Sequence, residues 1–196
     1  DPDVILIGSG IMSATLGAML KVLDPALRIQ LYEMTEEFGK EASNGWHNAG
    51  TGHAGLCELS YTPYYGSDRK VDVSKAFEIF HQFEHSKQFW SYAARTGMID
   101  KVEEFINPVP HLSFVYGQEQ VDFLKSRFTQ MQKHHFFEDM AYTEDREQIR
   151  EWAPLLLEGR DQTPLAVTKM ERGTDINYGT LSAKLIEWLG RQEGCG

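Results

Sequence analysis

A short apolar run followed at once by a glycine turn constrains the fold of this chain more than any other feature. Residues Asp3–Ile7 have the length and apolar character of a buried strand, and the turn Gly8-Ser-Gly10 follows directly. Ile11–Leu23 then has the apolar spacing of a helix, and Leu27–Glu33 has the length of a second strand. The order strand, glycine turn, helix and strand predicts a βαβ unit.

The glycine turn has the chemistry of a dinucleotide-binding site. Gly8 permits a tight turn, and Gly10 lets the backbone approach a pyrophosphate without a clashing Cβ. The helix N-terminus that follows supplies free N–H groups and a partial positive charge. Ser13 stands where glycine or alanine is usual, and Gly17, one turn later, can provide the close helix–strand packing instead. The cofactor-binding residues expected in this turn are Gly8, Ser9, Gly10, Ile11 and Met12.

An acidic residue completes this pattern at the end of the second expected strand. Glu33 lies 25 residues beyond Gly8. A carboxylate in this place accepts hydrogen bonds from both ribose hydroxyls of an adenosine and repels a 2′-phosphate, which argues against NADP. FAD and NAD are bound by the same device, so the motif leaves that choice open. The alternative is an ordinary βαβ unit with a glycine turn.

The composition excludes several classes of protein. The 196 residues include 19 Lys and Arg against 29 Asp and Glu, a net charge of −10, and no cluster of cations, which argues against nucleic-acid binding. The run Val4–Leu23 is as long as a membrane span, but glycines and hydroxyl residues interrupt it, so it is better divided into a strand and a helix. Cys57 and Cys195 match no zinc spacing, which indicates no metal site; whether they form a disulfide stays open.

The rest of the chain alternates helical and strand-like segments. A helix is expected at Ser74–Thr96, where residues from Ala76 to Trp90 form an aromatic stripe that is typical of a core. Residues 34–68 are rich in small side chains and have the length of a functional loop. Further helices are expected at Glu119–Lys133, Asp145–Trp152 and Tyr178–Leu189, and further strands at Leu112–Tyr116 and Leu165–Met170.

Several blocks resemble one enzyme family, malate:quinone oxidoreductase, in order along essentially the whole chain. Beyond the glycine turn, the most specific block is the small-residue loop Asn48-Ala-Gly-Thr-Gly-His53. The other matching blocks are Leu56-Cys-Glu-Leu-Ser-Tyr-Thr-Pro63, Pro110-His-Leu-Ser-Phe-Val115, Glu151-Trp-Ala-Pro154, Glu158-Gly-Arg160 and Gly173-Thr-Asp-Ile-Asn177.

The resemblance implies an activity, a cofactor and a location. The family oxidises (S)-malate to oxaloacetate with FAD, passes the electrons to a membrane quinone, and serves the tricarboxylic acid cycle. Its members are peripheral proteins on the cytoplasmic face of the bacterial cell membrane. They are also longer than this chain, so the resemblance implies that residues 1–196 are the N-terminal portion of a truncated protein.

The resemblance also implies a fold, because the family is related to the D-amino-acid and glycine oxidases. The expected class is α/β, with a Rossmann-like FAD-binding domain that starts as βαβ and an inserted α+β substrate domain. Residues 1–65 and 173–196 are then parts of the FAD-binding domain. Residues 66–172 hold a helical excursion and part of the substrate domain.

Oxidation of malate needs a base and cations that hold two carboxylates. His53 and His111 are the candidate bases, and the alternative for each is a structural hydrogen bond to a neighbouring turn. The candidate substrate-binding cations are Arg160, Lys169 and Arg172, for which surface charges are the alternative. The residues of the small-residue loop expected to contact the cofactor are Ser43, Asn48, Ala49, Gly50, Thr51 and Gly52.

Two other functions stay open at this point. One is a flavin-dependent oxidoreductase that acts on another 2-hydroxy acid. The other is a dinucleotide-binding fragment without turnover, and the 196-residue chain alone is expected to be inactive even if the parent enzyme is active.

Overall fold

The computed structural model describes residues 1–52, 55–65, 70–160 and 162–196. The chain divides into two compact units. The first unit contains residues 1–51, 86–107 and 175–196, and the second contains residues 52–85 and 108–174. Compared with the boundaries expected from the sequence, the structure places residues 86–107 in the first unit and residues 52–65 in the second.

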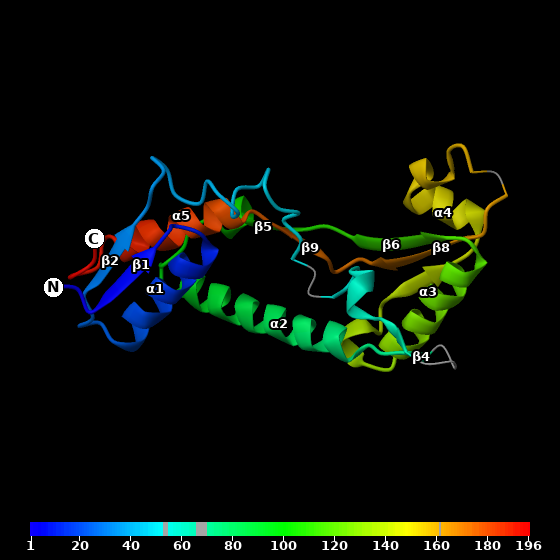
Figure 1. Ribbon diagram of the computed structural model, residues 1–196, viewed down its shortest axis with the longest axis horizontal. Coiled ribbons are helices and arrows are strands. Elements are labelled where there is room, and N and C mark those ends of the chain that lie inside the picture. Colours follow the sequence, from blue (N-terminus) through cyan, green and yellow to red (C-terminus); the bar gives the residue numbers. More distant parts are fainter. Residues whose placement is uncertain (53–54, 66–69, 161) are drawn as a thin grey trace. The chain divides into compact units, whose positions relative to one another are not determined.

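The first unit begins with the predicted βαβ arrangement. Strands β1 (Val4–Ile7) and β2 (Ile29–Tyr32) are parallel, and helix α1 (Ile11–Leu23) connects them (Figure 1). The run that is long enough for a membrane span is therefore divided between β1 and α1. In the described part of the chain, no helix is both long and apolar enough to cross a membrane. On the far side of β2, the Leu31 N–H donates to the Gly196 carbonyl (2.7 Å), which extends the pairing to the last residues.

Helix α5 (Tyr178–Leu189) completes the core of the first unit by packing against α1 (Figure 1). A Cβ at Gly17 would lie 2.7 Å from Leu189 Cδ2 and 2.9 Å from Leu6 Cδ1, so a larger residue there would force these two side chains to shift. Leu6, Ile29 and Leu189 are buried together there. The close packing expected at Gly17 is confirmed, and it compensates for the serine at position 13.

The second unit is built on a three-stranded antiparallel sheet. Its strand order is β6 (His111–Tyr116), β8 (Leu165–Met170) and β7 (Ala141–Thr143). Because neighbouring residues of a strand point to opposite faces, the sheet has two apolar sides. Val115 and Ala166 pack against helix α3 (Gln118–Met131), and Leu165 and Val167 pack against helix α4 (Arg146–Trp152) (Figure 1).

Helix α2 (Ser74–Arg95) begins in the second unit and ends in the first. Its predicted stripe is largely confirmed. Ala76 is fully buried in a cluster of the second unit, and Phe77 and Phe80 pack against that cluster. In the first unit, the Trp90 ring meets the Phe105 ring edge to face at 6.0 Å.

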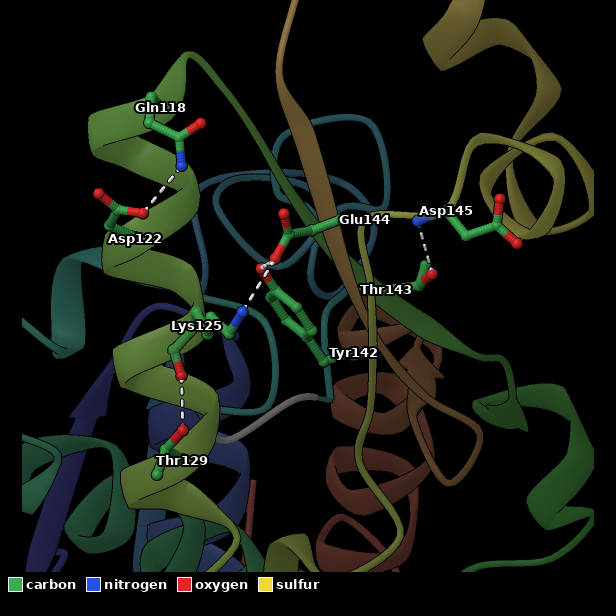
Figure 2. A network of polar contacts seen from close by, with 8 residues as sticks. All are labelled: Gln118, Asp122, Lys125, Thr129, Tyr142, Thr143, Glu144 and Asp145. Carbon is green, nitrogen blue, oxygen red and sulfur yellow. Dashed lines mark hydrogen bonds and ion pairs between the residues drawn. The ribbon is translucent and has the colours of Figure 1, made fainter.

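A polar network joins α3 to β7 on the surface of the second unit (Figure 2). The Tyr142 hydroxyl donates to Glu144 Oε1 (2.7 Å), and burial raises the pKa of Tyr142, so the hydroxyl keeps its proton. Lys125 Nζ lies 3.4 Å from the same carboxylate oxygen, but both side chains are exposed. An exposed ion pair adds little stability, so the stacking of Tyr142 on Phe128 contributes more to the packing of β7 against α3.

The shortest elements are the ones that the sequence did not predict. Strands of two or three residues are too short to show an alternating pattern. They are β3 (Tyr64–Tyr65), β4 (Lys70–Val71), β5 (Ile106–Pro108), β7 and β9 (Thr174–Ile176). The 3₁₀ helices are Leu59–Tyr61, Val102–Glu104, His135–Phe137 and Pro154–Leu157.

A buried lysine holds the end of α1 to the last residues of the chain. Lys21 is 5% exposed, and its ammonium group donates to the carbonyls of Pro25 (2.7 Å), Leu27 (2.8 Å) and Glu193 (2.5 Å). These three bonds use every N–H of the ammonium group. The lysine therefore replaces water for three backbone carbonyls beside the βαβ core.

The substitution Lys21→Met is expected to destabilise the protein by about 2–3 kcal/mol, because it removes three hydrogen bonds from a charged and buried donor. Urea unfolding followed by circular dichroism measures the change. Lys133→Met, at an exposed lysine, is the matched control. Equal stability of the two variants would contradict this role of Lys21.

Candidate functional site

The glycine turn opens into a cavity at the end of β1. Gly8 has φ of +84°, a conformation that glycine adopts without strain, and its N–H donates to the Tyr32 carbonyl (2.8 Å). A cavity of about 490 Å³ lies over the turn and is lined by Gly8, Ser9, Gly10 and Glu33 among others. The structure thus brings together three turn residues and the acidic residue that the sequence assigned to one cofactor.

Glu33 accepts four hydrogen bonds, so its carboxylate is held in one orientation. One oxygen accepts from the N–H (2.7 Å) and the hydroxyl of Ser9. The other accepts from the Thr35 N–H (2.8 Å) and shares the single proton of the Thr35 hydroxyl (3.0 Å) with the Glu37 carbonyl (2.8 Å). The Ser9 hydroxyl and the other donors lower the pKa of Glu33 to about 2. The carboxylate is therefore ionised at neutral pH, and all four of its acceptor positions are in use.

The N-terminus of α1 meets the small-residue loop at Ser43. Gly10 is the N-cap residue and has no side chain with which to cap the helix. The Ile11 N–H donates instead to the Ser43 hydroxyl (3.0 Å), and Ser43 is 6% exposed. The Gly39 N–H donates to the Ser9 hydroxyl (3.0 Å), which is a second link from the loop to the turn. The Met12 side chain is exposed.

Asn48 shapes the small-residue loop from within. Its amide nitrogen donates to the carbonyls of Ala42 (2.9 Å) and Asn44 (2.8 Å), and its amide oxygen accepts from the Gly50 N–H (2.8 Å). Further along, Thr51 bridges to Asp175, while Ala49 is exposed. Whether Asn48, Ala49, Gly50, Thr51 and Gly52 contact a cofactor stays a prediction, because none of them lines the cavity over the turn.

A second hollow of the first unit lies along α5. It has a volume of about 580 Å³, and its lining includes Phe38, Trp46 and Glu187. The Trp46 side chain is 95% exposed. None of the site residues expected from the sequence lines this hollow.

Of the two candidate bases, the structure describes only His111. His53 lies outside the described residues. His111 begins β6 and is 8% exposed, with Nε2 3.1 Å from the Thr174 carbonyl and Nδ1 3.7 Å from the Cys57 sulfur. A carbonyl only accepts hydrogen bonds, so Nε2 carries the proton, and Nδ1 accepts from the thiol. Burial raises the pKa of the Cys57 thiol, which keeps this donor protonated.

The three candidate substrate-binding cations each have a partner within the second unit. The Arg160 guanidinium lies over the Tyr116 ring at 4.3 Å. Lys169 forms an ion pair with Glu171 (2.5 Å), and Arg172 forms one with Asp139 (2.8 Å). Nothing in these contacts assigns a substrate to them, so their role stays a prediction. Over the ranges that the structure describes, no group of three or more histidine, cysteine and acidic side chains is arranged to hold a metal ion.

One buried cation of the second unit was not predicted from the sequence. Arg127 is fully buried, and it donates to Thr62 Oγ1 (3.1 Å) and to the carbonyls of Gly55 (3.2 Å) and Leu56 (3.3 Å). Burial lowers the pKa of its guanidinium to about 10, so it stays charged at neutral pH. Its position on the apolar stripe of α3, three residues after Leu124, could have indicated that it is buried. The two cysteines are both free.

The chain matches the family model for malate:quinone oxidoreductase over residues 1–196. It is 50% identical over 196 residues to a protein of Bradyrhizobium diazoefficiens named "Probable malate:quinone oxidoreductase", covering all of this chain and 38% of that relative. It is 54% identical over 185 residues to a protein of Staphylococcus epidermidis named "Probable malate:quinone oxidoreductase 1", covering 94% of this chain and 37% of that relative. The chain thus spans less than two fifths of the length of these relatives.

Solved structures with lower sequence identity share the fold. A glycine oxidase from Geobacillus kaustophilus has a TM-score of 0.63 at 18% identity, covering 100% of this chain and 45% of that one. An L-α-glycerophosphate oxidase from Mycoplasma pneumoniae, solved with FAD bound, has a TM-score of 0.59 at 14% identity, covering 99% and 43%. At such identities the likeness shows the fold alone, and it confirms the predicted α/β class.

The low pKa of Glu33 makes part of the folding stability depend on pH. An ionised carboxylate that is stabilised in the folded state contributes fully above its unfolded pKa of about 4.5, and this contribution is lost as the pH falls toward 2. The free energy of unfolding of the parent protein is therefore expected to fall more steeply from pH 6 to pH 3 than that of Glu33→Gln. Urea unfolding at a series of pH values measures both slopes.

Glu151→Gln, at an exposed carboxylate, is the matched control and is expected to keep the slope of the parent. Equal slopes for Glu33→Gln and the parent would contradict the hydrogen-bonded, ionised Glu33.

Proposed function

Because the chain belongs to the malate:quinone oxidoreductase family, we propose that the whole protein oxidises (S)-malate to oxaloacetate with FAD and passes the electrons to a membrane quinone. The match to the family model over residues 1–196 is the observation that carries this proposal. The relatives are longer, with 38% of the Bradyrhizobium protein covered, so the activity is proposed for the whole protein.

The cavity over the glycine turn fits the adenosine and pyrophosphate end of FAD. The start of α1, where the Ser43 hydroxyl accepts from the Ile11 N–H, offers N–H groups and a positive helix end to a pyrophosphate. Glu33 stands at the cavity as an ionised acceptor for the ribose hydroxyls. Its acceptor positions are occupied, so the ribose would replace the hydroxyls of Ser9 and Thr35, while the two backbone N–H donors stay. When bound, FAD supplies the acceptor for the hydride.

The proposed division of labour follows the two parts that the sequence indicated. The FAD-binding part, for which the sequence indicated residues 1–65 and 173–196, includes the turn and Glu33. Residues 66–172 supply part of the substrate domain. In this scheme a histidine takes the hydroxyl proton as hydride leaves malate. The sequence indicated His53 and His111 for this role, and the buried, hydrogen-bonded ring of His111 leaves His53 as the proposed base. Arg160, Lys169 and Arg172 are the proposed carboxylate ligands, and each would have to exchange its present partner for substrate.

We also propose that the whole protein is a peripheral protein at the inner face of the bacterial cell membrane, where it would meet its quinone partner. The net charge of −10 would be repelled by anionic lipid, so contact with the membrane has to be local or made by another part of the protein. Sedimentation of the full-length protein with liposomes tests this location, and absence from the lipid fraction counts against it.

Substrate preference tests the proposed reaction. The full-length protein is expected to show a flavin absorption spectrum and to reduce a quinone analogue faster with (S)-malate than with lactate or 2-hydroxyglutarate. The 196-residue chain alone is expected to show no turnover. Preference of the full-length protein for either of the other hydroxy acids would show a different flavin-dependent oxidoreductase.

Removing the charge of Glu33 tests the placement of FAD. Glu33→Gln in the full-length protein is expected to weaken FAD binding about 10- to 100-fold, because hydrogen bonds to a charged acceptor contribute about 1.5–3 kcal/mol. Flavin fluorescence titration of the apoprotein measures the affinity, and Glu151→Gln is the control. An unchanged affinity would exclude Glu33 as the ribose acceptor.

A further inference from the structure

We propose that His111 is a positioning residue, which, together with Cys57, holds the end of the small-residue loop in the conformation that FAD requires. The inference rests on the proposed function, because it takes FAD as the cofactor. It differs from the role of base that the sequence indicated for His111. Four steps of hydrogen bonding and packing within the second unit support it.

The first step is the attachment of Gly52, the last of the expected cofactor contacts in the loop. The Gly52 N–H donates to the Thr174 carbonyl (2.9 Å), and the Thr174 hydroxyl donates to the Gly52 carbonyl (2.7 Å). Both backbone groups of Gly52 are therefore bonded to one residue. The position of this end of the loop follows the position of Thr174.

The second step is the attachment of Thr174 to His111. The Thr174 carbonyl accepts from His111 Nε2 (3.1 Å) in addition to the Gly52 N–H, so both of its lone pairs are used. Gly173 allows this contact, because a Cβ there would lie only 2.3 Å from His111 Cδ2. The imidazole ring thus lies directly against the backbone that holds Gly52.

The third step fixes the ring itself. The Cys57 thiol lies 3.7 Å from Nδ1 and is the donor to it. With Nε2 as a donor and Nδ1 as an acceptor, the ring is held in one tautomer. A base must offer a lone pair to its substrate, whereas the Nδ1 lone pair accepts from the thiol and the ring is 8% exposed.

The fourth step fixes Cys57. The Ser113 hydroxyl donates to the Cys57 carbonyl (2.6 Å) from β6. From α3, Arg127 donates to the carbonyls of Gly55 and Leu56, the two residues that precede Cys57. These hydrogen bonds come from a fully buried, charged guanidinium, so they fix the segment that leads to Cys57.

The test compares His111→Gln with His111→Leu in the full-length protein. Glutamine retains an N–H donor near the place of Nε2 but has no titrating base, and leucine has neither. FAD affinity of the apoprotein is measured by flavin fluorescence, and kcat for malate oxidation is measured as a function of pH. His111→Gln is expected to stay within about threefold of the parent in both quantities and to keep its pH profile, whereas His111→Leu is expected to bind FAD about tenfold more weakly.

Cys57 offers a milder test should His111→Leu fail to fold. Cys57→Ser keeps a donor to Nδ1 and is expected to bind FAD like the parent. Cys57→Ala removes the donor and is expected to weaken FAD binding about threefold. Cys195→Ser, at the free cysteine of the first unit, is the matched control.

Three results would overturn the inference. A loss of about 100-fold in kcat for His111→Gln, together with a changed pH profile, would show that His111 is the base. FAD affinities of His111→Leu and Cys57→Ala equal to that of the parent would show that the contact does not position the loop. Absence of FAD binding by the parent would overturn the proposed function as well, whereas the first two results leave that function intact.

Discussion

The four hydrogen bonds to the Glu33 carboxylate are the interaction on which the candidate site depends. They join the glycine turn after β1 to the residues that follow β2, through Ser9 on one side and Thr35 on the other. A charged acceptor makes stronger hydrogen bonds than a neutral one, so the ionised carboxylate stabilises this junction. The same carboxylate is the group that the proposed cofactor would use. The ribose hydroxyls of the cofactor and the protein's own donors would thus compete for the same acceptor positions on Glu33.

The other contacts of the site depend on this junction. The Ser9 hydroxyl, which donates to Glu33, also accepts from the Gly39 N–H and so fixes the loop that returns toward α5. Ser43, further along that loop, accepts from the start of α1. The N–H groups of the helix end are therefore partly satisfied by side chains that an anion could replace. A site of this kind is preformed, which lowers the ordering cost of binding.

Periodic segments could be predicted from the sequence, and contacts between distant residues could not. The bounds of α1 and α5 agree with the sequence because a long apolar stripe bounded by Pro25 or Gly190 is a strong signal. The acidic residue of the site was found because its spacing from Gly8 is characteristic. The partners of His111 were not found, because Cys57 and Thr174 lie 54 and 63 residues away and no local pattern links them. The ion pair of Arg172 with Asp139 was missed for the same reason.

A crystal structure of the full-length protein with bound FAD tests whether the cofactor lies at the Glu33 junction. The adenosine ribose hydroxyls are expected to donate to Glu33 in place of the Ser9 and Thr35 hydroxyls, with the pyrophosphate at the start of α1. An adenosine bound elsewhere, with all four protein donors still on the Glu33 carboxylate, would contradict this placement.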